Sequence, residues 1–299
     1  MYKIGSFNCL NLGVSASNTK IIELANIILR EKFDIIALQE IKGKLALNRI
    51  LFCLGSGWRG SADNEVNDYA FIWNANKFEL ANAEEIGLTR EYAPRIYKQY
   101  RVDRKAGQKD LVREPFYARF FPTGGAAPYI EIRLINTHIR FSKGKEGEND
   151  MSLSAIAMRR NEFDVLTRAI YAKEADKRYG NNRPAYTFLL GDYNLNLPTS
   201  VAKSPYLLES FIIEDRRNIK VITTVQRGLT TLARASEQKE NVFSNNYDHF
   251  TYDVKRFDDV TIISNEVNVV EKYYKGDYEK YREDISDHIP VEMKMNLRG

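Results

Sequence analysis

The sequence predicts a single α/β domain of mixed strands and helices over residues 1–299. Short apolar runs, typical of buried strands, recur along the chain. Between them lie segments whose apolar residues recur at helical spacing. No internal repeat, low-complexity tract or linker divides the chain, so one large domain is preferred over two.

The apolar run at 186–190 is the central strand of this prediction, and it leads into Gly191-Asp192-Tyr193-Asn194. The glycine permits a sharp turn. Asp192 and Asn194 would share one face, because side chains alternate in extended backbone. A carboxylate and an amide would then lie together at the end of a buried sheet. The alternative is an Asx-turn after the strand, and the motif alone does not separate the two.

The first quarter of the chain predicts strands and helices in alternation. Residues 2–10 alternate between apolar and polar side chains, as a strand does. Residues 15–18 offer N-caps for a helix whose apolar residues recur as far as Leu29. The other elements predicted here are a strand at 33–38, a helix at 43–54 and a strand at 68–73.

Later elements complete the layered pattern. Strands at 115–121 and 129–136 are predicted to pair around the Gly124-Gly125 turn. Residues 142–150 are Gly-rich and charged, which predicts a loop. A long helix is predicted from Met151 to about Tyr179, with Phe163, Leu166 and Ile170 on its apolar face. The remaining strands are predicted at 186–190, 260–263 and 291–295.

Composition excludes several classes of protein. The formal charge is only +4, so any affinity for nucleic acid must come from the placement of basic residues. Cys9 and Cys53 are too few for a disulfide framework or a cysteine metal cluster. No apolar run approaches the ~20 residues of a membrane span. The first residues lack the features of a signal peptide, so a cytoplasmic location is expected, with export by another route as the alternative.

Polar residues with catalytic or metal-binding chemistry lie at the ends of one apolar run after another. Two of the three histidines in the chain belong to this set. Ligands of layered α/β proteins bind where strand ends converge. Carboxylates and amides suit a hard ion such as Mg²⁺ or Mn²⁺, and histidines beside carboxylates suit acid–base catalysis. The set is Asn8, Glu40, His138, Asp192, Asn194, Asp248, Asp287 and His288.

Five of these motifs, in this order, resemble the endonuclease/exonuclease/phosphatase superfamily and extend over nearly the whole chain. They are Asn8, Leu38-Gln39-Glu40, Asn136-Thr137-His138, Gly191-Asp192-Tyr193-Asn194 and Ser286-Asp287-His288-Ile289-Pro290. Arg113-Glu114-Pro115 and Tyr247-Asp248 most resemble the deoxyribonuclease I branch. The resemblance implies a four-layer α/β/β/α sandwich, with two mixed sheets face to face and helices outside. A monomer is expected.

The resemblance also implies roles for the residues. Glu40 would be the principal ligand of Mg²⁺, or of Mn²⁺ or Ca²⁺, with Asn8 and Asp287 nearby. Asp192 and Asn194 would orient or activate the attacking water and hold the phosphate. Asp248 would orient His288, the acid–base histidine. His138 would donate to a phosphate oxygen or act as the opposite acid–base partner. The residues expected to bind phosphate or substrate are Arg113, Lys42, Arg140 and Tyr69.

Three departures from the deoxyribonuclease pattern bear on these roles. The glutamate that orients the first histidine is replaced by Asn67, so that Glu65 or Asp68 would substitute or His138 would be less basic than usual. The arginine that usually follows the aspartate at 248 is His249, which we interpret as structural. The paired cysteines of the secreted deoxyribonucleases are absent, which fits an intracellular protein.

The expected function is metal-dependent hydrolysis of nucleic acid, with a DNA endonuclease as the first hypothesis. The alternative is a phosphatase or phosphodiesterase that acts on a lipid or a small phosphoester, because the same site chemistry serves both. A catalytically silent binding module is the third hypothesis, and it predicts a broken metal or histidine set. Every main position is filled, which argues against the third hypothesis.

The segment 90–113 favours nucleic acid, because it holds eight basic residues against three acidic ones and includes Tyr92, Tyr97 and Tyr100. Such a segment can track phosphates while its tyrosines stack on bases. The alternative is a solvated surface insertion.

If the segment tracks phosphates, replacing Arg95, Lys98, Arg101 and Arg104 by alanine should weaken DNA binding. The slope of log affinity against log salt should also flatten by about 0.9 for each lost contact on duplex DNA. Binding titrations at several salt concentrations measure both effects. Cleavage of a small phosphodiester is the control and should be nearly unchanged. A wild-type salt slope in the variant would identify the segment as a solvated insertion.

Overall fold

The computed structural model describes residues 1–63, 68–85, 113–125, 127–141, 155–180, 182–197, 211–215, 218–224, 228–234 and 241–297. Of the basic segment 90–113, only Arg113 lies within these residues. The predicted loop at 142–150 and the residues Glu65 and Asn67 lie outside them.

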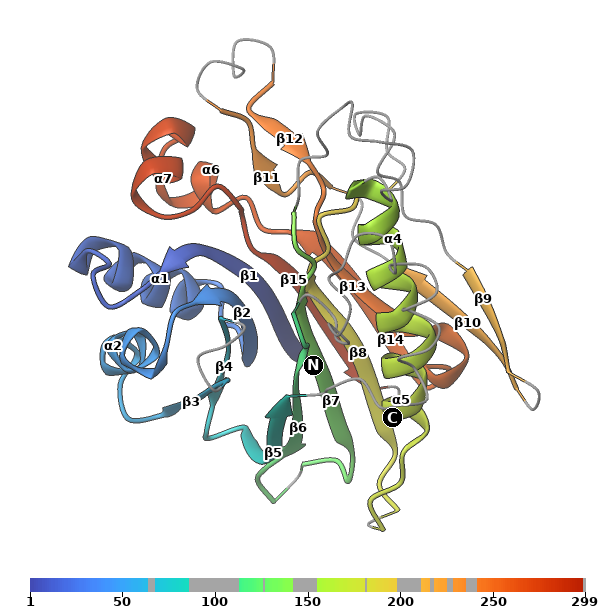
Figure 1. Cartoon of the computed structure of the whole chain (residues 1–299). Helices are drawn as coiled ribbons and strands as arrows, with labels where there is room; N and C mark the ends of the chain where they lie inside the picture. Colours follow the sequence, from blue (N-terminus) through green and yellow to red (C-terminus); the bar gives the residue numbers. More distant parts are fainter. Residues whose placement is uncertain are drawn as a thin grey trace.

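Two large mixed sheets form the centre of the molecule (Figure 1). The first has the strand order β14-β15-β1-β2-β4-β3 and the second β5-β6-β7-β8-β13-β10-β9. The strands of the first are β1 (Tyr2–Leu12), β2 (Ile35–Ile41), β3 (Trp58–Ala62), β4 (Tyr69–Asn74), β14 (Val260–Glu266) and β15 (Val291–Leu297). Those of the second are β5 (Phe78–Glu85), β6 (Phe116–Pro122), β7 (Glu131–His138), β8 (Ala185–Asp192), β9 (Phe211–Asp215), β10 (Asn218–Thr224) and β13 (Asp248–Asp253).

Alternating side chains of the central strands fill two different layers. Ala37 of β2 and Leu190 of β8 belong to the apolar cluster that both sheets share. Their neighbours Leu38 and Leu189 point the other way and pack in the outer clusters with helices. Strands buried on both faces therefore read as continuous apolar runs, as the sequence predicted.

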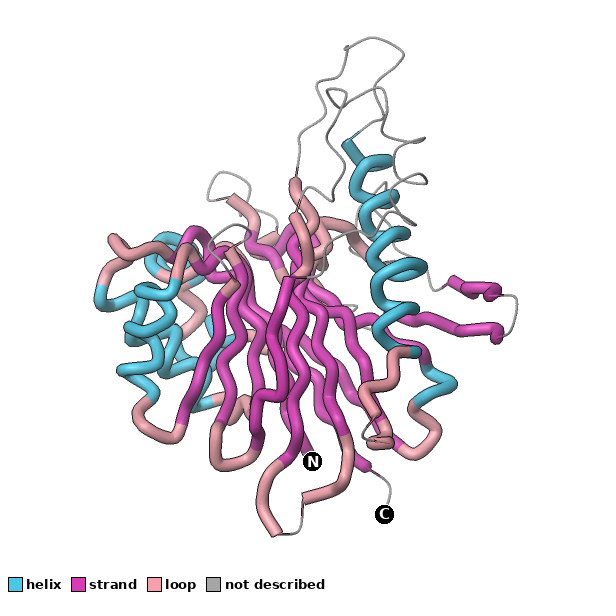
Figure 2. The backbone as a smooth tube through the Cα atoms, turned by 60° about the horizontal axis from the view of Figure 1, so that its bottom comes forward, coloured by secondary structure: helices cyan, strands magenta, loops and turns pink. Residues whose placement is uncertain are grey.

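Helices cover the outer face of each sheet (Figure 2). The outer cluster of the first sheet contains residues of α1 (Asn18–Arg30), α2 (Lys44–Leu54), α6 (Val269–Tyr273) and α7 (Tyr278–Asp284). That of the second contains residues of α4 (Ala155–Val165), the π-helix η1 (Leu166–Tyr171) and α5 (Ala172–Asp176). The layers are thus helix, sheet, sheet, helix, and the predicted four-layer sandwich is confirmed.

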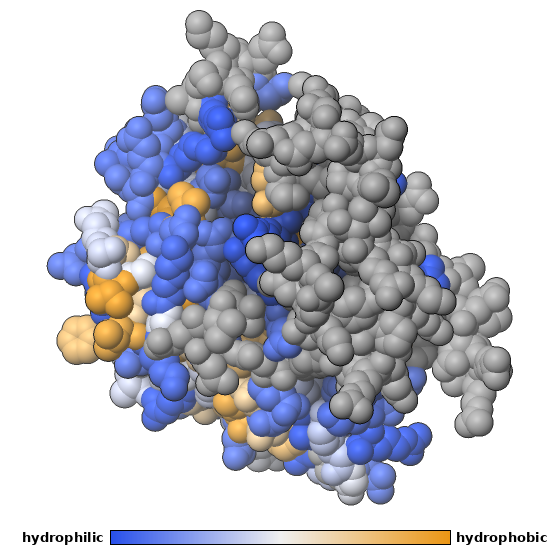
Figure 3. All heavy atoms as spheres, viewed as in Figure 1, coloured by the Kyte–Doolittle hydropathy of each residue, from blue (hydrophilic) through white to orange (hydrophobic). Residues whose placement is uncertain are grey.

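The helices are short and amphipathic. Ser17 caps α1 by accepting a hydrogen bond from the backbone N–H of Lys20 at 3.1 Å, as the cap residues predicted. In the space-filling view, hydrophobic residues gather over α1 and α2, where Leu45 and Phe52 are exposed (Figure 3). Across the described ranges, no helix has the length and apolar character needed to cross a membrane.

The single helix predicted from Met151 to Tyr179 is interrupted. Its described part begins at Ala155, widens into the π-helix at Leu166 and ends at Asp176. The hydroxyl of Thr167 donates to the carbonyl oxygens of Phe163 and Asp164, at 2.8 and 3.1 Å. Such back-bonding competes with the regular helical ladder, which the apolar pattern alone cannot reveal.

Two small elements complete the fold, and the strands β3, β5, β9 and β10 have no predicted counterpart. A short hairpin pairs β11 (Thr231–Leu232) with β12 (Phe243–Asn245), and the 3₁₀ turn η2 (Val254–Arg256) follows β13. The edge strands β3 and β5 were not predicted. Their residues are largely half-buried or exposed, so they form no continuous apolar run.

Gly191 lies inside β8 and not at a turn after it. Its backbone has a φ of 138° and pairs with Thr137 of β7 in parallel register. A Cβ at this position would lie 1.9 Å from the carbonyl oxygen of Thr137. The glycine is thus required by close approach of two strands, a constraint that replaces the predicted sharp turn.

Gly191→Ala should destabilise the protein by on the order of 3 kcal/mol, because the new methyl group meets rigid backbone and not a flexible side chain. Denaturant unfolding measures the change. Gly125→Ala is the matched control, since nothing lies within 4 Å of its added Cβ. Equal stability of the two variants would contradict the close approach.

Candidate active site

The strand ends of both sheets converge on a cavity of about 450 Å³. The convergence follows from topology: β1 and β2 are parallel, as are β7 and β8, while β13 and β15 run antiparallel to their neighbours. Asp248 lies just outside the cavity, fully buried behind His288. The other seven residues of the predicted strand-end set line it, namely Asn8, Glu40, His138, Asp192, Asn194, Asp287 and His288.

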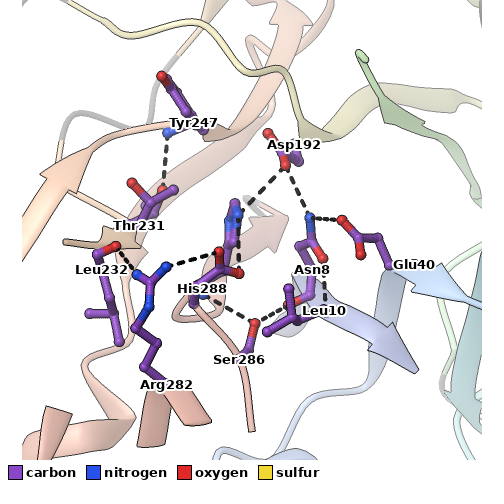
Figure 4. A network of polar contacts seen from close by, with 12 residues as sticks. Asn8, Leu10, Glu40, Asp192, Thr231, Leu232, Tyr247, Arg282, Ser286 and His288 are labelled. Carbon is purple, nitrogen blue, oxygen red and sulfur yellow. Dashed lines mark hydrogen bonds and ion pairs between the residues drawn. The ribbon is translucent and has the colours of Figure 1, made fainter. Parts of the chain in front are cut away.

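Asn8 joins the two sheets across this cavity. Its Nδ2 donates to Glu40 Oε1 at 3.2 Å in its own sheet and to Asp192 Oδ2 at 3.0 Å in the other (Figure 4). Its Oδ1 accepts from the backbone N–H of Leu10 at 3.0 Å. Glu40 also accepts from the N–H of Asn11, 2.7 Å from Oε2. The orientation of the Glu40 carboxylate is therefore fixed by β1.

Backbone strain gathers around these residues. Leu10, Asn11, Glu40 and Asn194 have left-handed backbone, with φ between 48° and 62°. β1 also shifts register against β2 between Asn8 and Leu12. Left-handed non-glycine residues cost about 1–3 kcal/mol each and concentrate at functional sites. None of these left-handed conformations follows from the residue type alone.

Asp192 and Asn194 do not share a face through strand alternation, which corrects the sequence prediction. β8 ends at Asp192, whose Oδ1 accepts from the backbone N–H of Asn194 at 2.9 Å. This is the Asx-turn that was the alternative. Asn194 Nδ2 donates to the carbonyl oxygen of Ile139 at 2.7 Å, which anchors the side chain at the cavity edge. Both residues still line the cavity.

His288 is held in place from several sides. Its Nδ1 lies 2.8 Å from Asp248 Oδ2, and its Nε2 lies 3.7 Å from Asp192 Oδ2. Ser286 Oγ accepts from the backbone N–H of His288 at 3.1 Å and donates to the carbonyl oxygen of Asn8 at 2.7 Å. The hydroxyl of Tyr281 donates to the carbonyl oxygen of His288 at 2.9 Å. The ring therefore faces Asp192 in a single orientation.

The charges around His288 determine its protonation. Burial of the ring opposes the cationic form, but the carboxylates of Asp248, Asp192 and Asp287 outweigh it and raise the pKa of His288 to about 10. Burial raises the pKa of Asp192 to about 7, with the Asp248 carboxylate adding to the effect and His288 opposing it. The site thus pairs a cationic histidine with a carboxylic group that titrates near neutral pH.

His138 has the opposite electrostatics. Its Nδ1 contacts a guanidinium nitrogen of Arg113, and its Nε2 lies 3.4 Å from Asp192 Oδ2. Burial, together with the positive charges of Arg113 and His288, lowers the pKa of His138 well below its usual value. This direction agrees with one of the two alternatives drawn from the Asn67 departure, a His138 that is less basic than usual. Nδ1 contacts the guanidinium of Arg113, and the carboxylate of Glu40 lies 4.0 Å from the same atom.

Tyr69 lies behind the site and not in it. Its side chain is fully buried, and its hydroxyl accepts from the backbone N–H of His138 at 2.7 Å. It therefore positions His138. It does not line the cavity, which corrects the expectation that Tyr69 binds phosphate. Lys42 and Arg140 are exposed and do not line the cavity. His249 is buried with Nε2 2.7 Å from the carbonyl oxygen of Leu195, in agreement with a structural role.

Several cavity residues were missed by sequence reasoning. Phe141 forms part of the wall. Arg159 of α4 does not line the cavity but is buried beside it, with one guanidinium nitrogen 2.9 Å from the carbonyl oxygen of Asn194. The hairpin β11–β12 and Arg282 of α7 form another wall. No motif marks these residues, because their place depends on how distant segments pack.

The donor set was compared with the needs of a divalent cation. Among the described residues, no three Asp, Glu, His or Cys side chains form a ready metal site. The predicted ligands are two carboxylates, Glu40 and Asp287, and the amide oxygen of Asn8. Mg²⁺ is typically held by one or two carboxylates and keeps several waters. An open site of oxygen donors therefore fits Mg²⁺ and does not fit zinc.

Comparisons with known proteins bear on the fold. No family model matches the sequence, and no curated protein matches it either. An endonuclease/exonuclease/phosphatase from Bacteroides vulgatus has a similar structure, with a TM-score of 0.58, 13% identity, and coverage of 99% of this chain and 98% of that one.

Two further solved structures have the same architecture. A mannosyl-6-phosphatase from Bacteroides thetaiotaomicron has a TM-score of 0.56 and 13% identity, over 99% of this chain and 100% of its own. Truncated TDP2 from Caenorhabditis elegans has a TM-score of 0.54 and 14% identity, over 98% and 97%. The chain therefore has the endonuclease/exonuclease/phosphatase fold of the deoxyribonuclease I-like type, which the five sequence motifs implied.

Proposed function

We propose that the chain is a divalent-metal-dependent phosphodiesterase that hydrolyses nucleic acid, with DNA as the expected substrate and endonucleolytic cleavage as the expected mode. One observation carries the proposal. Two histidines whose pKa values shift in opposite directions, His288 upward and His138 downward, face the same buried carboxylate, Asp192, in one polar cavity. When the environments of two titratable groups shift their pKa values in opposite directions, one group is suited to act as the acid and the other as the base.

Hydrolysis of a phosphodiester requires activation of a water and neutralisation of the developing negative charge. Asp192 would accept the proton of the attacking water, since its pKa of about 7 suits a general base at neutral pH. The cationic His288 would donate a hydrogen bond to a phosphate oxygen or a proton to the leaving group. Its high pKa favours this role over that of general base.

The remaining residues would bind and orient the phosphate. His138, held neutral by Arg113, would be a donor through Nε2, while Arg113 adds positive charge at the same point. Asn194 would position the substrate from the end of the Asx-turn. Glu40, Asn8 and Asp287 would hold a divalent cation, which supplies Lewis-acid stabilisation of the phosphoryl oxygens.

The substrate is inferred from features other than the catalytic residues. Nucleic acid is supported by the Arg113-Glu114-Pro115 resemblance and by the basic segment 90–113. A phosphatase acting on a small phosphoester is the second candidate, because one structural neighbour is a mannosyl-6-phosphatase. The two differ in whether a polynucleotide or a terminal monoester is cleaved.

With Mg²⁺, the protein should nick supercoiled plasmid DNA, and excess EDTA should abolish the nicking. His288→Gln should lower the cleavage rate by roughly 10²–10³, as loss of an oxyanion donor does. Gel electrophoresis of the plasmid forms measures both effects, and circular dichroism verifies folding. Arg178→Gln is the control, because Arg178 is an exposed residue of a different cavity.

Release of phosphate from a hexose 6-phosphate without any nicking would replace the proposal by the second candidate. No hydrolysis of either substrate at any divalent metal would contradict both. EDTA-resistant nicking would contradict the metal requirement alone.

Asp248→Asn should lower the pKa of His288 from about 10 toward ~6.5, because it removes the nearest carboxylate charge. The measurement is an NMR titration of the imidazole nitrogens in EDTA. The chain has only three histidines, so the signals are easily assigned. Asp259→Asn is the control, since Asp259 accepts from Tyr186 near the other end of β8. An unchanged His288 titration would exclude Asp248 as its partner.

The same shift has a consequence for stability. The folded-state pKa of His288 lies above that of an unfolded histidine, so its ion pair stabilises the fold fully below pH ~6.5. That contribution is lost as the pH rises through about 10.

A further inference from the structure

The cavity is divided electrostatically between two walls. One wall carries the carboxylates of Glu40 and Asp192, and Asp287 lies beside the other wall, 3.8 Å from Arg282. The facing wall is the hairpin β11–β12 with α7, and it contributes two arginines, Arg234 and Arg282. Within the described hairpin residues 228–234 and 241–247, no acidic residue occurs. A ligand that spans the cavity therefore meets a carboxylate end and a cationic end.

The hairpin is attached directly to the catalytic segment. The backbone N–H of Leu232 donates to the carbonyl oxygen of Asp287 at 2.8 Å, and that of Ile289 donates to the carbonyl oxygen of Thr230, also at 2.8 Å. Thr231 pairs with His288 as an isolated β-bridge. The position of the hairpin is thus coupled to His288 and is not that of an independent loop.

Arg282 maintains this attachment. One of its guanidinium nitrogens donates to the carbonyl oxygens of Leu232 and Ala233, and the other lies 3.8 Å from Asp287 Oδ2 (Figure 4). One guanidinium nitrogen is thus bonded to the hairpin backbone, and a second is ion-paired with Asp287. We therefore regard Arg282 as a positioning residue that also adds positive charge to the wall.

Arg234 differs from Arg282 in its exposure and in its lack of polar contacts. It is exposed and lines the cavity. In the part of the chain that the structure describes, it forms no hydrogen bond or ion pair. Its backbone position is nevertheless defined, because the preceding residue, Ala233, is buried and donates its N–H to the carbonyl oxygen of Val242 at 2.9 Å. An arginine on a defined backbone with an unused guanidinium suits an anionic ligand.

We infer that the substrate carries a second phosphate next to the one that is hydrolysed, and that Arg234 binds it. The inference rests on the proposed function, which places the reacting phosphate beside Asp192 and His288. Arg234 follows two residues after Leu232, which contacts Asp287, so the second phosphate binds beside the first. A neighbouring nucleotide of a polynucleotide, or a small molecule with two phosphates, would supply it.

The test compares the binding of thymidine 5′-monophosphate and thymidine 3′,5′-bisphosphate by calorimetry in Mg²⁺, with chromatography to verify that the ligands stay intact. The wild-type protein should bind the bisphosphate about tenfold more tightly, the order expected for one charge-assisted pair. Arg234→Gln should reduce this ratio toward one, and Arg234→Lys should retain part of it. Arg178→Gln, at the opposite end of β8, should keep the wild-type ratio.

Equal affinity of the wild-type protein for the two ligands would overturn the inference, and so would a wild-type ratio in Arg234→Gln. The dinucleotide pTpT distinguishes the sources. A gain equal to that of the bisphosphate supports a polynucleotide, whereas a gain with the bisphosphate alone supports a small molecule with two phosphates. Turnover of the 4-nitrophenyl ester of thymidine 5′-monophosphate tests the proposed function separately, because the binding measurement does not require hydrolysis.

Discussion

The hydrogen bonds of a single amide, Asn8, hold the two sheets in register at the site. Its Nδ2 is shared between Glu40 of one sheet and Asp192 of the other. Deeper in the sandwich, Gln39 Nε2 donates to Asn136 Oδ1 at 2.8 Å, and Asn136 Nδ2 donates to the carbonyl oxygen of Leu38 at 3.0 Å. Polar groups between apolar sheets must find partners. These hydrogen bonds therefore fix how the two sheets face each other, and they also fix the width of the cavity.

Several buried charges concentrate around that junction. Asp192 and Asp248 occupy paired positions of β8 and β13, and both are buried. Two adjacent carboxylates would repel each other, and the cationic His288 between them offsets much of that repulsion. Removing one partner of such a group leaves an uncompensated buried charge, which is costly. Stability and chemistry at this site therefore depend on the same three residues.

The same arrangement explains why the pKa values of His288 and His138, which line the same cavity, shift in opposite directions. Both rings are buried and lie near Asp192, but His288 Nδ1 contacts the carboxylate of Asp248 whereas His138 Nδ1 contacts the guanidinium of Arg113. The difference is produced by neighbours that come from β13, from the segment before β6 and from the residues before β15. The strained backbone at Glu40 and Asn194 aims their side chains into the same space. The cavity thus depends on long-range packing for its electrostatics and on local strain for its geometry.

The sequence by itself determined the α/β class, the central strands and the residues that close them, because apolar runs and strand-end motifs are local features. Glu40 and His288 were recognised in this way, and both line the cavity. Tertiary structure alone decided that Tyr69 lies behind His138 and that Arg234 and Arg282 border the cavity. These outcomes depend on contacts between segments separated by tens to hundreds of residues. Residue types and their spacing carry no record of such contacts, since burial, strain and neighbouring charge arise only when the sheets pack.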